Sequence, residues 1–186
     1  MTVIRHIVTK DRVGRNMIFV TVGTHEQQFD RLISCIDQLK NDGKITERVL
    51  IQTGYSKYVP QHCEWQQFFT YDEMLDNVAE ARIVITHGGP SSFIMPLQVG
   101  KTPIVVPRRK KYGEHVNNHQ VEFCNAVAKR MGTIIVVNRI ENLEKCVLNY
   151  DKVKQRLNGE KGEGIGNNTE FCKRFESIVD GMIGEI

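Results

Sequence analysis

The sequence predicts an α/β protein built on one Rossmann-like, doubly wound parallel sheet. Two observations support this fold class. Short apolar runs alternate with amphipathic, helix-like segments from residue 17 to residue 137, and such alternation is typical of parallel sheets. The runs are apolar at nearly every position rather than at every second one, so helices must cover both faces of the sheet.

The first half of the pattern opens with MIFVTVG, residues 17–23, which predicts a buried strand stopped by glycine. A helix should follow and close near Gly43. Its apolar face consists of residues at helical spacing, namely Phe29, Leu32, Ile33, Ile36 and Leu39. Two more strands are expected, a clear one at residues 48–54 and a weaker one at residues 65–69.

The second half repeats the alternation three times. Pro96 should kink one of its helices or end the regular part of that helix, and Gly132 should close the last one. The expected strands are 82–89, 102–107 and 133–137, and the expected helices are 72–81, 91–100 and 119–132.

These elements define one main domain, residues 17–157, between two peripheral parts. Residues 1–16 are expected to be an N-terminal extension without the apolar stretch of a signal peptide. Residues 158–168 are rich in glycine and predict a flexible loop before a final helix, residues 169–186. The apolar stripe of that helix either packs on the sheet, the more common outcome, or docks to a partner.

Composition narrows the classes of function. The net charge is only +3, and the sequence lacks the dense basic face that is typical of a nucleic-acid-binding protein. The five cysteines are odd in number and contain no CxxC pair, which argues against disulfides and a zinc site and indicates a reducing cytoplasm. No apolar run reaches the roughly 20 residues needed to cross a bilayer.

Three expected strands end in unusual polar loops, VGTHEQQ, QTGYSKY and THGGPSS, which share one rim of a parallel sheet. In THGGPSS, two glycines allow close approach to the backbone, and Pro90 suits the first helical position. Ser91 and Ser92 then bring hydroxyl and N–H groups to the positive end of a helix dipole, which suits phosphate. A tight turn with a serine cap explains the same residues equally well.

A second polar cluster, GEHVNNHQ at residues 113–120, follows the fifth expected strand. Its amide and imidazole groups suit a ligand rich in hydroxyls, and simple capping of the next helix is the alternative. Glu114 and His115 are acid–base candidates that nothing in the local sequence orients. His25 and His87 each follow an expected strand, where a lone histidine is more often structural.

The basic run RRKK, residues 108–111, has three interpretations. A solvated loop is the default for a run of like charges. Contact with an anionic membrane surface or a lipid pyrophosphate comes second, and nucleic acid comes last.

Three stretches, VTVGTHEQQFDRL, ITHGGPSSFIMPLQVGKTPIVVP and GEHVNNHQVEF, together resemble the C-terminal, nucleotide-sugar-binding half of family 28 glycosyltransferases. The resemblance extends to bacterial galactosyl- and glucuronosyltransferases of capsule and exopolysaccharide synthesis. It reaches, more distantly, the catalytic subunit of the eukaryotic lipid-linked chitobiose synthase and the peptidoglycan GlcNAc transferase. It implies one half of a two-domain GT-B fold.

The resemblance also implies roles for residues. The diphosphate of a UDP-sugar would lie on the glycines and serines after the fourth strand, and the sugar on the Asn-His-Gln segment. More distant members carry a glutamate for the ribose where this sequence has Met95. Weak candidates for the catalytic base are His25 and Glu114, unless the base lies on a partner. The implied substrate-binding residues are Gly23, Thr24, His87, Gly88, Gly89, Ser91, Ser92, Asn118, His119 and Gln120.

The function implied is that of an inverting glycosyltransferase subunit that moves a hexose from a UDP-sugar to a lipid-linked saccharide. Galactose is favoured, with glucuronic acid and N-acetylglucosamine as alternatives. No metal or other cofactor is expected, because the sequence has no DxD pair. A membrane-anchored subunit would supply the acceptor half at the inner face of the cell membrane. Two rival functions stay open, a non-catalytic regulator that binds nucleotide sugars and an epimerase or hydrolase that acts alone.

Overall fold

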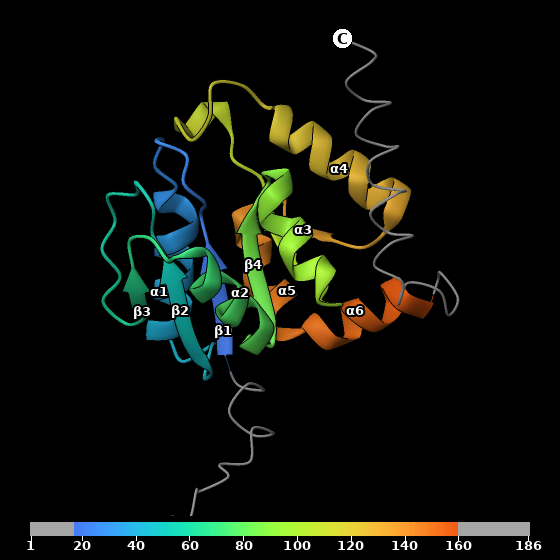
Figure 1. Cartoon of the computed structure of the whole chain (residues 1–186), viewed down its shortest axis with the longest axis horizontal. Coiled ribbons are helices and arrows are strands. Elements are labelled where there is room, and N and C mark those ends of the chain that lie inside the picture. Colours follow the sequence, from blue (N-terminus) through green and yellow to red (C-terminus); the bar gives the residue numbers. More distant parts are fainter. Residues whose placement is uncertain (1–16, 160–186) are drawn as a thin grey trace, which may run out of the picture. The chain divides into compact units, whose positions relative to one another are not determined.

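The computed structural model describes residues 17–159 and contains one sheet of six strands within that range. The strands lie in the order β3-β2-β1-β4-β5-β6, and every neighbouring pair is parallel. This confirms the predicted doubly wound sheet (Figure 1). The strands are β1 (Met17–Thr21), β2 (Arg48–Gln52), β3 (Glu64–Gln66), β4 (Ile83–His87), β5 (Ile104–Val106) and β6 (Ile135–Val136).

Helices connect the strands as the alternation predicted, except that β3 follows β2 without a helix between them. Contacts group the described residues up to Tyr150 into one compact unit, and the remainder of α6 falls in a second unit. The helices are α1 (Asp30–Asn41), α2 (Tyr71–Glu80), α3 (Pro90–Gln98), α4 (His119–Met131), α5 (Leu143–Leu148) and α6 (Tyr150–Gly159), with short 3-10 turns η2 (Lys110–Tyr112) and η3 (Ile140–Asn142).

Three sequence signals set helix ends where they were expected. Pro90 occupies the start of α3, where its missing N–H leaves no helical bond unmade. Pro96 lies inside α3, and the helix ends two residues later at Gln98. Gly132 closes α4 in the left-handed conformation, with φ of 57°, and donates its N–H to the carbonyl of Ala128.

Two predicted boundaries were wrong. The third strand is Glu64–Gln66 rather than 65–69, and all three of its residues are exposed, so no apolar alternation marked its ends. α6 continues through Asn158 and Gly159, where a loop was expected. The expected extension 1–16, the rest of the loop and the final helix 169–186 lie outside the described residues.

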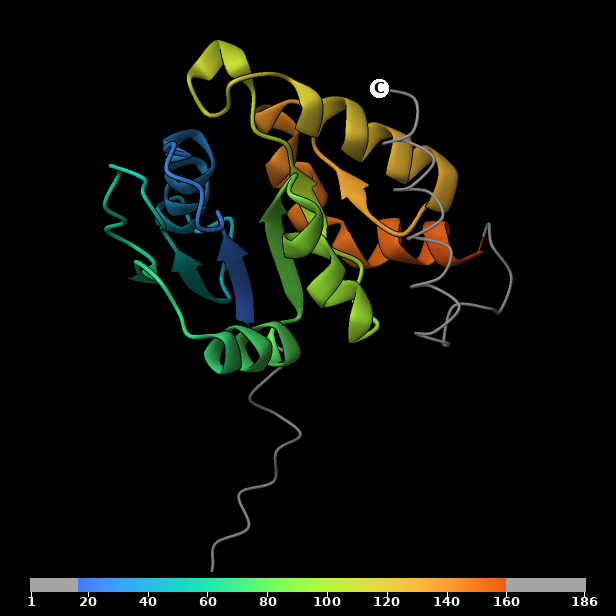
Figure 2. The same cartoon turned by 45° about the horizontal axis from the view of Figure 1, so that its top comes forward.

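The strand order fixes where a ligand site can form. Starting from β1, the chain first builds the sheet toward β3 and then returns to add β4, β5 and β6 on the other side of β1. The helices after β1 and β4 therefore lie on opposite faces of the sheet, and ligands of doubly wound sheets bind beyond the carboxyl ends of two such strands. Figure 2 shows η2 and the first turns of α3 and α4 at that end of the sheet.

Candidate functional site

His87 is the polar centre of the site. It is the last residue of β4 and only 8% exposed. Its Nδ1 accepts the Gly89 N–H at 2.9 Å, so the ring proton of the neutral imidazole lies on Nε2. Nε2 therefore donates to Ser92 Oγ, at 2.5 Å. Burial first, and then the charge of Arg108, lower the pKa of His87 to about 3, which keeps the ring neutral.

This hydrogen bond determines what Ser92 can offer a ligand. Ser92 Oγ accepts the hydrogen bond from His87 Nε2. The hydroxyl proton of Ser92 therefore points away from the ring and can be donated elsewhere. The Ser92 N–H bonds to the carbonyl of Gly89 at 3.1 Å. The Ser91 N–H has no protein partner among residues 17–159. The first turn of α3 thus presents one hydroxyl donor and one backbone donor at the positive end of its dipole.

The structure gives its own reason why glycine is needed at three positions of the site. A Cβ on Gly23, whose φ is +73°, would lie 2.3 Å from His87 Nε2, and a Cβ on Gly89 would lie 2.3 Å from His87 Cε1. A Cβ on Gly88 would lie 2.9 Å from Cys124 Sγ. These glycines therefore make room for the His87 ring and for α4, whereas close approach of a ligand was the predicted reason.

Arg108 holds the β1–α1 loop over the end of the sheet. Its guanidinium donates to the carbonyls of Val22, Gln27 and Gln28 at 2.8, 2.8 and 2.9 Å, and to that of Glu114 at 3.1 Å. The side chain is fully buried, and burial lowers its pKa to about 10. The default interpretation of residues 108–111 as a solvated loop is therefore wrong for Arg108. Lys110 and Lys111 are exposed, as that interpretation required.

Glu114 does not have the geometry of a catalytic base. Its side chain is fully buried, and its two oxygens accept from Arg31 Nε and Nη2 at 2.7 and 2.8 Å. One of them also accepts the backbone N–H of Arg109 at 2.9 Å. A carboxylate enclosed by two guanidinium bonds cannot reach an acceptor hydroxyl, so this prediction is corrected to a structural role.

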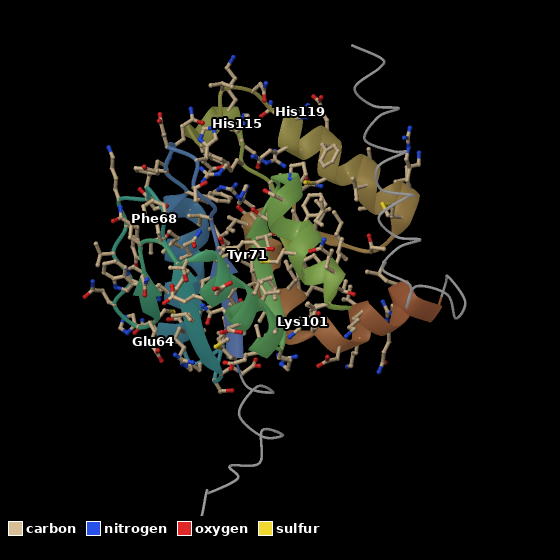
Figure 3. The ribbon with its side chains drawn as sticks, viewed as in Figure 1. Glu64, Phe68, Tyr71, Lys101, His115 and His119 are labelled. Carbon is tan, nitrogen blue, oxygen red and sulfur yellow. The ribbon has the colours of Figure 1, made fainter. Side chains whose placement is uncertain are left out.

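Gln120 joins the first turn of α4 to the end of β4. Its Oε1 accepts the N–H groups of Gly88 and Arg108, both at 3.1 Å, and its side chain is buried. Because this oxygen already accepts two hydrogen bonds, it is not available for the predicted contact of Gln120 with a sugar. Asn118 and His119, in contrast, are exposed at the start of α4. Figure 3 labels His119 and His115 at the same end of the molecule.

The β1–α1 loop brings His25 to this rim. His25 is exposed, as is its neighbour Thr24. Partial burial first, and then the charges of Arg108 and His115, lower the pKa of His25, although Glu26 opposes them. The His25 ring centroid lies 5.3 Å from that of His115.

Met95, where an acid was expected for the ribose, is partly buried and packs against the hydrophobic cluster that includes Phe19 and Val84. Its side chain therefore belongs to the core of the domain. This position of α3 therefore offers no acidic side chain to a ligand.

A basic pocket lined by neither His87 nor Ser92 lies among residues of α1, η2 and η3 and their loops. It has a volume of about 150 Å³ and contains four cationic side chains. Among the described residues, no group of three metal-ligating side chains occurs, and the described cysteines are free. The pocket is lined by Arg31, Arg109, Lys111, Tyr112, Asn138, Arg139, Ile140 and Glu141.

Comparison with known families agrees with the fold. Residues 17–175 match the sequence model described as "Glycosyltransferase family 28 C-terminal domain". The chain belongs to this family. Among curated relatives, the human protein "UDP-N-acetylglucosamine transferase subunit ALG13" is 32% identical over 121 residues, which are 60% of this chain and 10% of that protein. The mouse protein of the same name is 30% identical over 122 residues, with the same coverage.

This family 28 chain thus spans about a tenth of the length of these curated relatives. Among solved structures, the glycotransferase of kitacinnamycin aligns with a TM-score of 0.58 at 16% identity, over 89% of this chain and 44% of that one. CalG4, the calicheamicin glycosyltransferase, aligns with a TM-score of 0.55 at 12% identity, over 90% and 43%. At such identities the likeness shows the fold alone, which is one half of a GT-B architecture.

Proposed function

We propose that this family 28 domain binds a UDP-sugar at the carboxyl ends of β1 and β4 and serves as the donor half of an inverting glycosyltransferase. One observation supports this most strongly. The neutral, buried His87 donates to Ser92 and so leaves the Ser92 hydroxyl proton free at the start of α3. An array of fixed donors at a helix N-terminus is suited to a diphosphate.

The same array acts in the chemical step. In inversion, the acceptor oxygen attacks the anomeric carbon while the bond from that carbon to the diphosphate breaks, so negative charge grows on the departing UDP. The Ser92 hydroxyl, the Ser91 N–H and the α3 dipole stabilise this charge without rearranging. Asn118 and His119 contact the sugar hydroxyls, and the loop at Gly23 and Thr24 borders the same space.

The donor and the partner are further parts of the proposal. The human and mouse relatives are named as subunits of a UDP-N-acetylglucosamine transferase, so UDP-GlcNAc joins UDP-galactose and UDP-glucuronate as a donor to test. The word subunit in these names supports a partner chain. In our proposal this partner carries the acceptor half, is anchored in the membrane and holds this chain at the inner face. None of the helices in residues 17–159 is both long and apolar enough to span a bilayer. The acceptor is a lipid-linked saccharide.

A transfer assay tests the proposal. The full chain is co-expressed with a candidate membrane-anchored acceptor subunit, and membranes are incubated with each radiolabelled UDP-sugar. We expect label in the lipid fraction with one donor. A regulator would bind UDP without transfer by any partner, and an epimerase or hydrolase would convert the UDP-sugar as an isolated chain. No lipid-linked label with any donor would contradict the proposed function.

A further inference from the structure

Two imidazoles face each other beside the proposed donor site. His25 lies in the β1–α1 loop, and His115 lies between η2 and α4. Their ring centroids are 5.3 Å apart, with an angle of 39° between the planes. Both rings are close enough to His87 for their charges to act on it. Since His87 bonds directly to Ser92, the pair belongs to the same rim as the start of α3.

The hydrogen bonds of His115 select its tautomer. Its Nδ1 lies 3.0 Å from Asn117 Oδ1. The same Oδ1 accepts the backbone N–H of His119 at 3.1 Å, and a backbone N–H can only donate, so the amide oxygen, not the amide nitrogen, faces His115. The Asn117 N–H also approaches Nδ1, but at 3.4 Å, near the limit of a hydrogen bond. His115 Nδ1 therefore carries the proton, and Nε2 keeps its lone pair.

The bond made by His25 selects the opposite tautomer. Its Nδ1 accepts the backbone N–H of Gln27 at 3.2 Å, so the proton of the neutral ring lies on Nε2. The lowered pKa of His25, caused by partial burial first and by Arg108 and His115 next, favours this neutral form. In this geometry, His25 presents a donor toward the site rather than a basic nitrogen.

We propose that His115 is the general base of the transfer reaction, with Asn117 as its positioning residue and His25 as a neutral hydrogen-bond donor beside it. This inference rests on the proposed glycosyltransferase function. The acceptor O–H gives its proton to His115 Nε2 as the oxygen bonds to the anomeric carbon. The electron pair of the broken sugar–phosphate bond leaves on the diphosphate oxygen of UDP.

Two other acid–base groups of the rim are committed elsewhere. Glu114 is buried against Arg31, and both ring nitrogens of His87 have partners. The ring of His119 is stacked on Phe123, at 6.0 Å between centroids, and no described residue hydrogen-bonds to its nitrogens, so nothing selects a tautomer and the ring stays assigned to the sugar hydroxyls. The remaining charged groups that act on His25 are Arg108 and Glu26.

NMR of the full chain, without any partner, tests the tautomers. Long-range ¹H–¹⁵N correlation of ¹⁵N-histidine-labelled protein at neutral pH distinguishes a protonated from an unprotonated ring nitrogen. We expect a protonated Nδ1 and a bare Nε2 in His115, and the reverse in His25. Asn117→Ala should abolish the single tautomer of His115. A wild-type His115 with its proton on Nε2 would overturn the assignment.

Transfer kinetics test the role of the base. With wild-type transfer established, His115→Ala should lower kcat by about 100-fold or more without weakening UDP binding. Asn117→Ala should lower kcat less. Asn117→Asp should restore activity and move the acid limb of the pH profile upward, because a carboxylate favours the protonated ring. His62→Ala, a change of an exposed histidine outside the site, is the control and should leave kcat unchanged.

The outcomes separate the two proposals. If the wild-type chain transfers sugar and His115→Ala stays within about threefold of its kcat, the base assignment is wrong and the proposed function stands. An unmoved acid limb in Asn117→Asp would remove the positioning role. If the wild-type chain transfers no sugar, the proposed function fails, and the NMR measurement still decides the tautomers.

Discussion

Breaking the buried ion pair between Glu114 and Arg31 should destabilise the fold strongly, and replacing Glu114 by Gln tests this. Glu114 is fully buried and receives three short bonds, from Arg31 Nε and Nη2 and from the Arg109 N–H, at 2.7, 2.8 and 2.9 Å. Glutamine keeps the size of the side chain but removes its charge. It also places an NH₂ group against a guanidinium or an N–H, where no acceptor is available.

The expected cost follows from burial. Removing one partner of a buried ion pair leaves an uncompensated charge and costs about 3–5 kcal/mol. The chain contains a matched control in Arg48 and Glu64, which form the same two-bond geometry at 2.9 and 2.7 Å. Their side chains are 51% and 58% exposed, so Glu64→Gln should cost less than about 1 kcal/mol.

Urea denaturation of the two variants, followed by circular dichroism and linear extrapolation, measures both costs. We expect Glu114→Gln to lower the free energy of unfolding at least about three times as much as Glu64→Gln does. Equal costs for the two variants would refute the reasoning, because burial would then have no influence on the ion pair.

Three further predictions concern the site and the fold. Ser92→Ala should weaken UDP binding, measured by calorimetry, about 10- to 100-fold, because a bond to a charged group contributes about 1.5–3 kcal/mol; an unchanged Kd would contradict the assigned phosphate contact. Gly89→Ala puts a Cβ 2.3 Å from His87 Cε1, so urea unfolding should show a loss of about 1–3 kcal/mol, and no loss would refute the close packing. Asp37 is buried, which raises its pKa, but four hydrogen bonds lower it below 3.8 overall. Stability should therefore fall as the pH drops below about 4, and an equal fall in Asp37→Asn would contradict this.

The fold could be predicted because its signals are local. Fully apolar strands such as β1 and β4 are legible in the sequence, and Pro90 and Gly132 mark helix ends by their backbone restrictions. β3 was misplaced because an exposed edge strand carries no apolar pattern. The place of the site also followed from the sequence, since parallel strands end on one rim.

The roles of polar residues could not be predicted, because they depend on partners distant in sequence. Arg108 looked like part of a charged loop, yet it bonds to carbonyls about 80 positions earlier in the chain. Glu114 looked like a free acid until Arg31 was placed against it. Asn117 is close to His115 in the sequence, but only the structure shows its amide oxygen 3.0 Å from the Nδ1 of that ring.

The proposed function depends on the binding of UDP at the start of α3, beside His87. Titration of the ¹⁵N-labelled chain with UDP, followed by amide ¹H–¹⁵N spectra, tests it most directly. We expect saturable shifts that are largest in residues 88–93 and 23–25. Shifts confined to the basic pocket around Arg109 and Arg139, or the lack of any saturable shift, would contradict it.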